Sequence, residues 1–236
     1  MFTDNAGVRI HALDNGVDDT SLPPVVVVPG MGESAEEYAW LLTELGNRRV
    51  VIVDVRGRGQ SDAPEQGYRW EDHYGDLAAM VEACALDGPV FVAFSRGSSY
   101  AMGYALSHPG VLRGLVIGDY WARHVGLPPE FGERQLEVVL RGVPMSERMP
   151  AHAVHGVVRD SREVPLWDRV RELDCPVLII RGGRSSVIVT DELAEQWEAA
   201  LPGVEFAMLP KAGHDLWSRD QDAYLDVLRP FLDRIR

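Results

Sequence analysis

Short runs of apolar residues recur along the chain, and segments with apolar residues every three or four positions lie between them. The runs predict buried strands at residues 24–30, 49–55, 89–94, 112–119, 175–182 and 204–210. The periodic segments predict helices at residues 34–46, 70–86, 96–108, 191–201 and 220–235. Strands that are apolar throughout are typical of parallel strands covered by helices on both faces. The pattern therefore predicts an open α/β sheet in one domain, with a short antiparallel strand near residues 8–13.

One long stretch, residues 120–176, interrupts the alternation because it holds more chain than one crossover helix needs. Residues 165–173 are predicted to be that helix, and weaker helical patterns lie at 130–142 and 146–160. An excursion after the carboxyl end of a strand lies over the ligand crevice of an open sheet. We expect residues 1–121 and 164–236 to form the core and residues 122–163 to form a small helical lid. A surface embellishment without a role is the alternative.

A serine lies where one buried strand ends and the next helix begins. In the segment VFVAFSRGSSYAMG (90–103), Ala93 and Gly97 flank Ser95 at two positions on either side. Such a turn holds the serine in a strained backbone conformation and presents its hydroxyl at a helix N-terminus above the sheet. We expect Ser95 to be a nucleophile, and the alternative is that it only caps the helix.

A serine hydroxyl becomes a nucleophile when a base accepts its proton, and an oriented histidine is the usual base. His214 follows the last predicted strand, at the same edge of the sheet as Ser95. His11 and His73 are expected at the surface. A metal site is not expected, because the pair His152 and His155, three positions apart, has no third ligand nearby.

Four segments occur along the chain in this order: VVVVPGMGES, DVRGRGQSD, AFSRG and AGH. On the basis of these segments, nearly the whole chain resembles the α/β-hydrolase family. The resemblance implies an α/β-hydrolase fold, a mostly parallel open sheet flanked by helices on both faces. It also implies a chain order of nucleophile, acid and histidine, which Ser95, Asp119 and His214 follow. The backbone N–H groups of Met31 and Arg96 would form the oxyanion hole, and no cofactor is expected. Asp54 and Arg56, in the second segment, would have structural roles.

The sequence departs from the family pattern at three places. The oxyanion turn begins Pro29-Gly30 where the family has His-Gly, and Ala93 replaces the first glycine of the elbow. The third departure is the segment 182–185 (GGRS), which lacks the carboxylate that the family usually carries after this strand.

Asp119 ends the strand at 112–119, from which a subset of similar enzymes takes its acid. We expect its carboxylate to accept the Nδ1–H of His214. The alternatives are that Asp119 only caps its turn and that Asp191 or Asp215 is the acid.

Serine at the elbow argues against dehalogenases and epoxide hydrolases, since similar enzymes of those classes use aspartate there. We expect hydrolysis of a small or medium carboxylic ester or lactone. A carbon–carbon, thioester or amide hydrolase, a perhydrolase, and an inactive binding protein of the same fold stay open.

Several residues are predicted to contact the substrate: Gly30, Tyr120, Trp121 and His124. Arg96 either pairs with a substrate carboxylate or with a neighbouring acidic side chain. The lid residues Leu136, Val139 and Leu140 either line an apolar pocket or pack onto the core.

Composition limits the partners. The chain has 36 acidic and 23 basic residues, a net charge of −13, which repels nucleic acid and anionic membranes. It has no apolar run long enough to span a bilayer, no visible secretory signal, and only two cysteines, too few for a disulfide framework. We expect a cytoplasmic protein that acts on a small molecule. The sequence leaves the oligomeric state open.

Overall fold

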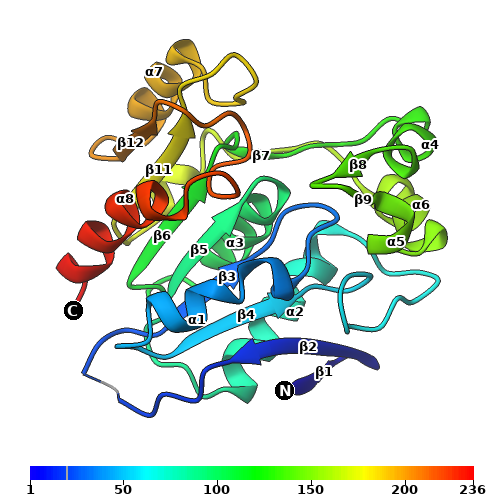
Figure 1. Ribbon diagram of the computed structural model, residues 1–236, viewed down its shortest axis with the longest axis horizontal. Coiled ribbons are helices and arrows are strands. Elements are labelled where there is room, and N and C mark those ends of the chain that lie inside the picture. The colour runs from blue at the N-terminus through cyan, green and yellow to red at the C-terminus, as the bar shows by residue number, and fades with distance from the viewer. Residues whose placement is uncertain (20) are drawn as a thin grey trace.

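The computed structural model describes residues 1–19 and 21–236. Its centre is an eight-stranded sheet in the order β1-β2-β4-β3-β5-β6-β11-β12 (Figure 1). The pairs β1–β2 and β2–β4 are antiparallel, and the remaining neighbours are parallel. This confirms the predicted, mostly parallel α/β sheet. The strands are β1 (Phe2–Asn5), β2 (Val8–Asp14), β3 (Val25–Val28), β4 (Val50–Asp54), β5 (Val90–Phe94), β6 (Gly114–Gly118), β11 (Val177–Gly182) and β12 (Glu205–Leu209).

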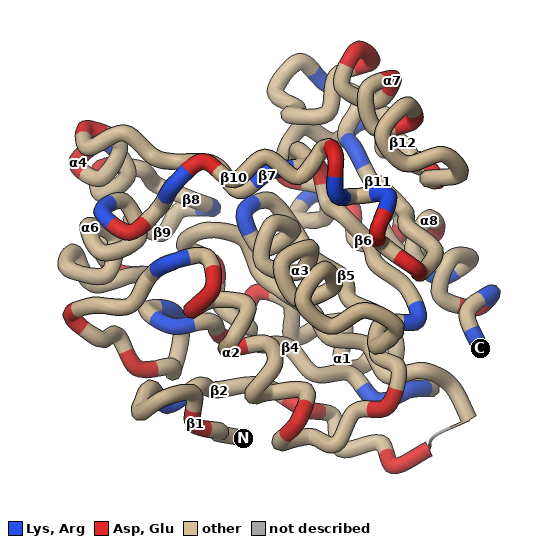
Figure 2. Tube along the Cα trace, turned by 180° about the vertical axis from the view of Figure 1, so that it is seen from behind, with Lys and Arg blue, Asp and Glu red and all other residues tan. Residues whose placement is uncertain are grey.

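Helices cover both faces of the sheet, which explains why its central strands are apolar throughout. Helices α1 (Trp40–Glu44) and α8 (Gln221–Arg234) lie on the face towards the viewer in Figure 1. Helices α2 (Trp70–Ala83), α3 (Arg96–Ser107) and α7 (Asp191–Ala200) cover the other face, and α2 and α3 are seen in Figure 2. Alternate residues of β3 enter different cores, since Val25 and Val27 pack with the α1–α8 side and Val26 and Val28 with the α2–α3 side.

Two predicted helices of the core differ from the structure. Residues 34–46 form a 3-10 helix, η1 (Ala35–Tyr38), followed by the short α1. Residues 165–173 form no α-helix, only the 3-10 helix η2 (Val170–Glu172). Strand β10 (Val164–Pro165) pairs with β7 outside the central sheet, and the chain between β10 and β11 contains η2 as its helical turn.

The segment 122–163, which we call the lid segment, lies beyond the carboxyl ends of the central strands (Figure 1). Strand β7 (Arg123–His124), near its start, pairs antiparallel with β10, which directly follows its last residue. Between them lie α4 (Glu130–Leu136), β8 (Val139–Leu140), β9 (Val143–Pro144), α5 (Met145–Arg148) and α6 (Ala151–Asp160).

The predicted helix at 130–142 ends early because residues 139–144 form the hairpin β8–β9. Its turn has positive φ angles at Arg141 (50°) and Gly142 (81°), which no helix accommodates.

Two histidines that were predicted at the surface are buried, so that prediction is wrong. His11 is 5% exposed and its Nδ1 lies 2.8 Å from the Asp54 carboxylate. His73, a buried residue of α2, is 1% exposed. Asp54 also accepts the Ala35 N–H at 2.6 Å, which fits the structural role expected for it.

No helix in the described part of the chain combines the length and the apolar character needed to cross a membrane.

Candidate active site

The turn between β5 and α3 holds Ser95 in a strained conformation. Its φ and ψ angles are 50° and −130°, and its N–H donates to the Gly118 carbonyl at 2.9 Å. Backbone crowding explains the glycine two positions later: a Cβ at Gly97 would lie 2.3 Å from the Pro29 carbonyl oxygen. The close approach of these two backbones fixes the Ser95 side chain above the sheet.

Three side chains from separate segments form one hydrogen-bonded row at the carboxyl edge of the sheet. The Nε2 of His214 lies 3.0 Å from the Ser95 Oγ, and its Nδ1 lies 2.7 Å from the Asp119 Oδ2. With a proton on Nδ1, the imidazole donates to Asp119 and leaves Nε2 free to accept the serine proton. The structure therefore brings together the three residues predicted as nucleophile, base and acid.

The Asp119 carboxylate is fully buried and well supplied with donors. Its backbone φ is 46°, and its oxygens accept the N–H groups of Ile188 at 2.9 Å and Val189 at 2.8 Å. The two other acids considered from the sequence have different partners. Asp191 pairs with Arg181 at 2.6 Å, and Asp215 pairs with Arg141 at 3.0 Å.

The two residues predicted to supply the N–H groups of an oxyanion hole line the same cleft as the serine. Arg96 is the first residue of α3, where an N–H has no partner inside the helix. Met31 follows Gly30 in the turn after β3, and both Met31 and Arg96 line the cleft that contains the Ser95 side chain. No acceptor among the described residues takes the N–H of either residue.

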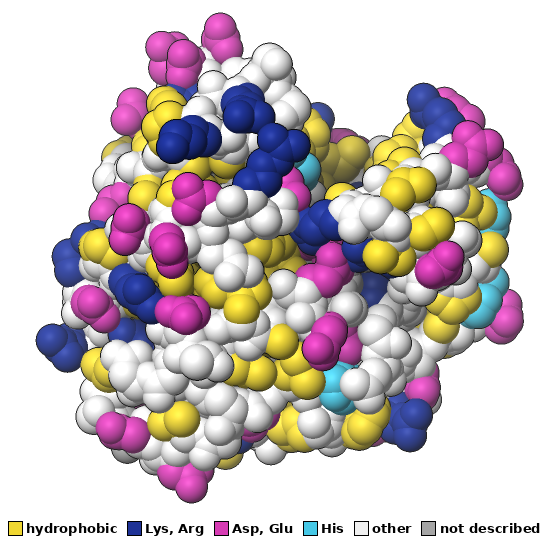
Figure 3. Space-filling view, in the orientation of Figure 1, with side chains coloured by type: hydrophobic (Ala, Val, Ile, Leu, Met, Phe, Trp, Pro, Cys, Tyr) yellow, Lys and Arg dark blue, Asp and Glu magenta, His cyan; other side chains and the backbone are white. Residues whose placement is uncertain are grey.

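A cleft of about 430 Å³ lies between the core and the lid segment, and Figure 3 shows it as a hollow lined largely by hydrophobic side chains. Ser95 and His214 lie on its core side. Apolar residues of both parts line it, with Phe94, Trp121 and Ile188 from the core and Phe131, Leu140 and Met145 from the lid segment. This lining suits an apolar substrate group.

The predicted substrate contacts divide into two groups. Tyr120 and Trp121 line the cleft, whereas Gly30 and His124 do not. The Gly30 N–H is buried and donates to the Glu33 carboxylate at 2.7 Å. His124 is buried behind the cleft, where its Nε2 lies 2.9 Å from Arg96, so its prediction as a substrate contact is wrong.

The Arg96 guanidinium pairs with no carboxylate among the described residues. It donates to the Tyr100 hydroxyl at 3.1 Å and to the Val125 carbonyl at 3.0 Å, and it contacts His124. Burial and this neighbouring cation lower the pKa of His124 to about 2, so the ring is neutral. The expected pairing of Arg96 with a neighbouring acidic side chain is therefore wrong.

The three apolar lid residues named from the sequence do not act alike. Leu140 lines the cleft, Leu136 packs against the internal core of the lid segment, and Val139 is 61% exposed.

Two charged residues of the cleft wall, Glu33 and Arg141, were not found from the sequence. Arg141, at the tip of the β8–β9 hairpin, places its NH2 2.8 Å from the Glu33 Oε1. The side chain of Glu33 is 2% exposed, and its burial raises its pKa although the Arg141 charge opposes the shift. The signal available in the sequence was Arg141-Gly142 between two short apolar segments, residues 138–140 and 143–145, a pattern that indicates a hairpin turn.

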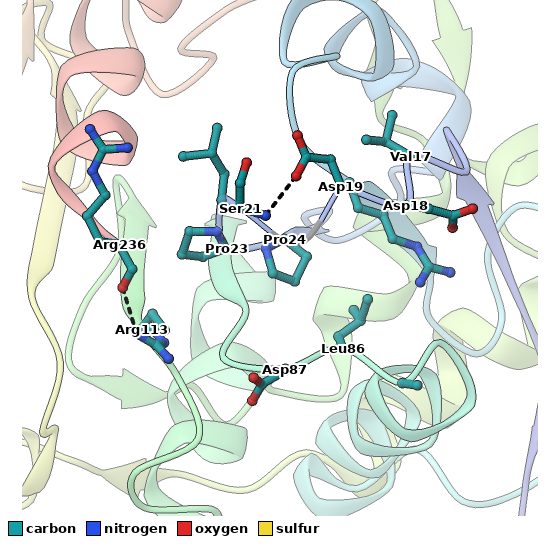
Figure 4. Close-up of a pocket in the computed structure, with 13 residues that line it drawn as sticks. Val17, Asp18, Asp19, Ser21, Pro23, Pro24, Leu86, Asp87, Arg113 and Arg236 are labelled. Carbon is teal, nitrogen blue, oxygen red and sulfur yellow. Dashed lines mark hydrogen bonds between the residues drawn. The ribbon is translucent and has the colours of Figure 1, made fainter.

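A second cavity, of about 410 Å³, lies at the amino ends of the strands, opposite the serine (Figure 4). The Pro23–Pro24 segment and Leu86 form part of its lining. Two of its three arginines are already engaged, since Arg49 pairs with Asp14 at 2.8 Å and Arg113 donates to the Arg236 carbonyl at 2.6 Å.

The two histidines of the lid segment have separate partners. His152 contacts the Ala63 carbonyl at 2.9 Å, and His155 lies 3.6 Å from Glu133. Within the residues that the structure describes, no three His, Cys, Asp or Glu side chains are grouped to hold a metal ion.

Comparisons with known proteins agree with the fold. The chain is 24% identical to a Bacillus subtilis protein named "Putative 2-succinyl-6-hydroxy-2,4-cyclohexadiene-1-carboxylate synthase", over 99% of this chain and 98% of the relative. It is 25% identical to an esterase of Mycobacterium tuberculosis, over 90% and 84% of the two chains. The crystal structure of an enol-lactonase from Burkholderia xenovorans superimposes with a TM-score of 0.82 at 18% identity, covering 99% and 100%. The model of the alpha/beta hydrolase family matches residues 25–227, and the chain therefore belongs to that family.

Proposed function

We propose that this protein is a serine hydrolase that cleaves small or medium carboxylic esters or lactones through an acyl-enzyme intermediate. The observation that carries the proposal is the row of Ser95, His214 and Asp119, joined at 3.0 and 2.7 Å. The relatives named as an esterase and an enol-lactonase support a hydrolase of this kind.

In this proposal His214 accepts the hydroxyl proton while the Ser95 Oγ attacks the substrate carbonyl carbon. The imidazolium that forms is stabilised by the buried Asp119 carboxylate. The negative carbonyl oxygen of the tetrahedral intermediate accepts hydrogen bonds from the N–H groups of Met31 and Arg96, at the N-terminus of α3. His214 then gives its proton to the leaving alcohol, and a water molecule repeats the sequence on the acyl-enzyme.

The cleft favours an uncharged substrate. Its lining is largely apolar, and the lid segment supplies one wall, for which we propose the role of a lid over the bound molecule. The two arginines that line the cleft, Arg96 and Arg141, have partners within the protein. A substrate carboxylate would have to displace those partners. The Bacillus relative, whose name specifies a carboxylate product, is therefore a less suitable guide to the substrate than the esterase.

A fluorophosphonate probe tests the proposal directly. We expect stoichiometric labelling of Ser95, found by peptide mass spectrometry, and no labelling of the Ser95→Ala or His214→Ala variants. A panel of p-nitrophenyl esters and lactones of increasing acyl length then defines the substrate. An unlabelled Ser95 in the folded protein, together with no turnover on the panel, would instead favour a binding protein that lacks catalysis.

A further inference from the structure

The tip of the β8–β9 hairpin places one guanidinium group against three carboxylates of the core. The Arg141 NH2 lies 2.8 Å from Glu33, and its NH1 lies 2.8 Å from Glu37. Its Nε and NH2 donate to the two oxygens of Asp215 at 3.0 and 3.2 Å. In Figure 1 the hairpin points from the lid segment towards the core. Arg141 thus contacts three separate positions of the core.

The Glu33 contact leads to the oxyanion turn. The Glu33 Oε2 accepts the Gly30 N–H at 2.7 Å and the Tyr38 hydroxyl at 2.6 Å, so the carboxylate closes the turn that carries Met31. This carboxylate is buried, and Arg141 is the cation that contacts it in the described chain. Removing the cation would leave a buried charge without compensation, which strongly disfavours the present arrangement of the turn.

The Asp215 contact leads to the histidine. Asp215 adjoins His214 in the chain, and the Ser218 hydroxyl also donates to it. Although partial burial opposes the shift, the hydrogen bonds from Arg141 and Ser218 hold the pKa of Asp215 below its usual value. The carboxylate is therefore charged at neutral pH and gives Arg141 a two-point contact.

Aromatic packing connects the same guanidinium to the nucleophile. Arg141 lies over the Trp217 ring, 4.8 Å from its centroid. Trp217 packs edge-on against Phe94 at 4.5 Å, and Phe94 lies next to Ser95 in the chain and 4.9 Å from the His214 ring. Arg141 therefore contacts the residues that hold the oxyanion turn and the histidine loop, and it contacts Trp217, which packs on Phe94 beside the serine.

We propose that Arg141 is a positioning residue that holds the oxyanion turn, through Glu33, and the histidine loop, through Asp215, in their active spacing. The inference rests on the proposed function, because spacing matters to catalysis only if Ser95 is acylated. Arg141 would then influence the rate although it does not contact the reacting atoms. The Arg141 guanidinium would bind carboxylates of the protein and not a substrate carboxylate.

Kinetics on a p-nitrophenyl ester test the catalytic part. We expect Arg141→Met to lower kcat about 10- to 100-fold and to change KM by no more than about threefold. This decrease in kcat would be at most similar to the one that removal of an oxyanion-hole donor causes. Arg141→Lys should fall in between, since an ammonium group cannot make the two-point contact with Asp215. The matched control is Arg159→Met, which removes the same charge from an exposed position of α6.

The double variant Glu33→Gln/Arg141→Met separates positioning from general destabilisation. Its amide can still accept the Gly30 N–H, and it leaves no buried charge without a partner. We expect kcat of the double variant to be about tenfold higher than kcat of Arg141→Met. An increase in KM at constant kcat would overturn the proposal in favour of substrate binding. Equal loss in Arg159→Met, or no recovery in the double variant, would also overturn it.

Hydrogen exchange gives a readout that does not need turnover. In Arg141→Met, the amides of residues 30–33 and 212–217 should exchange at least about tenfold faster than in the wild type and in Arg159→Met. Unchanged exchange in both segments overturns the inference. If the wild type shows no turnover, the proposed function fails, while exchange still decides whether Arg141 holds the two loops. If Arg141→Met does not fold, Arg141→Lys carries both measurements.

Discussion

Replacing Asp119 by Asn tests the proposed catalytic acid with almost no change in shape. The Oδ2 of Asp119 faces the His214 Nδ1 at 2.7 Å and the Ile188 N–H at 2.9 Å, while its Oδ1 faces the Val189 N–H at 2.8 Å. All three neighbours donate to a carboxylate that only accepts. An amide has one NH2 group, which must face at least one of these donors.

Both orientations of the amide impair the site. With its NH2 at the Oδ2 position, the Asn donates to Nδ1, which forces the proton of His214 onto Nε2, and the ring can then no longer accept the Ser95 proton. With its NH2 at the Oδ1 position, the tautomer is retained, but the Val189 N–H loses its acceptor. In either case the imidazolium lacks a full negative charge beside it. We expect kcat to fall about 10³- to 10⁴-fold, or about 4–5.5 kcal/mol of transition-state stabilisation.

Stability should change much less. One buried N–H without an acceptor costs about 1–3 kcal/mol, so Asp119→Asn should stay folded. The assays are steady-state hydrolysis of a p-nitrophenyl ester, the rate of fluorophosphonate labelling of Ser95, and urea unfolding. Labelling should slow in parallel with kcat. A folded variant with kcat within about tenfold of the wild type would refute the assignment of Asp119 as the acid.

Three other variants or conditions have defined outcomes. Gly97→Ala should destabilise the fold by about 1–3 kcal/mol or more in urea unfolding, because the added Cβ would meet the Pro29 and Val28 carbonyl oxygens at 2.3 and 2.5 Å; unfolding like that of the wild type would contradict this crowding. Trp121→Ala should raise KM about tenfold or more for aryl or long acyl esters and little for acetate esters, and equal effects on both would place Trp121 outside the acyl pocket. Burial lowers the pKa of His73 well below its usual value, as it does for His124. The two neutral rings make their full contribution to the free energy of unfolding above about pH 6.5, and the contribution of each ring falls by about 1.4 kcal/mol per pH unit as the pH decreases. In urea unfolding, the free energy of unfolding of His124→Gln should therefore fall less steeply below about pH 6 than that of the wild type.

The central strands were predictable because each consists of consecutive apolar residues. A run such as Val25–Val28 is buried on both faces, and no other element of that length explains four apolar residues in a row. Strand β1 was missed because its sequence, Phe-Thr-Asp-Asn, lies at the sheet edge with its side chains half exposed or exposed. Whether a strand lies at the edge of a sheet depends on the strands with which it pairs, and a local sequence pattern does not specify these partners.

The three residues of the proposed catalytic row were predictable because parallel strands end at one edge of the sheet. Ser95 and Asp119 each follow such a strand directly, and His214 follows another after a short loop. The Arg141–Glu33 pair was not predictable in this way, since more than a hundred residues separate its members in the chain. The burial of His124 was not predictable in this way either, since its partner Arg96 lies 28 residues away and a local pattern places Arg96 at a helix start without showing where its guanidinium lies.

The location of Asp119 explains how the proposed site can have an acid although the loop after β11 has none. Strands β6 and β11 are parallel neighbours, with Gly118 opposite Ile180, so their carboxyl ends lie one strand spacing apart, about 5 Å. A carboxylate at either end reaches a histidine held at the same edge. The loop after β11 keeps a part in this arrangement, because its Ile188 and Val189 N–H groups bind the Asp119 carboxylate. These donors fix the position of the carboxylate beside His214, so in the proposed mechanism a change in this loop should affect catalysis through Asp119 even where it touches neither His214 nor the substrate.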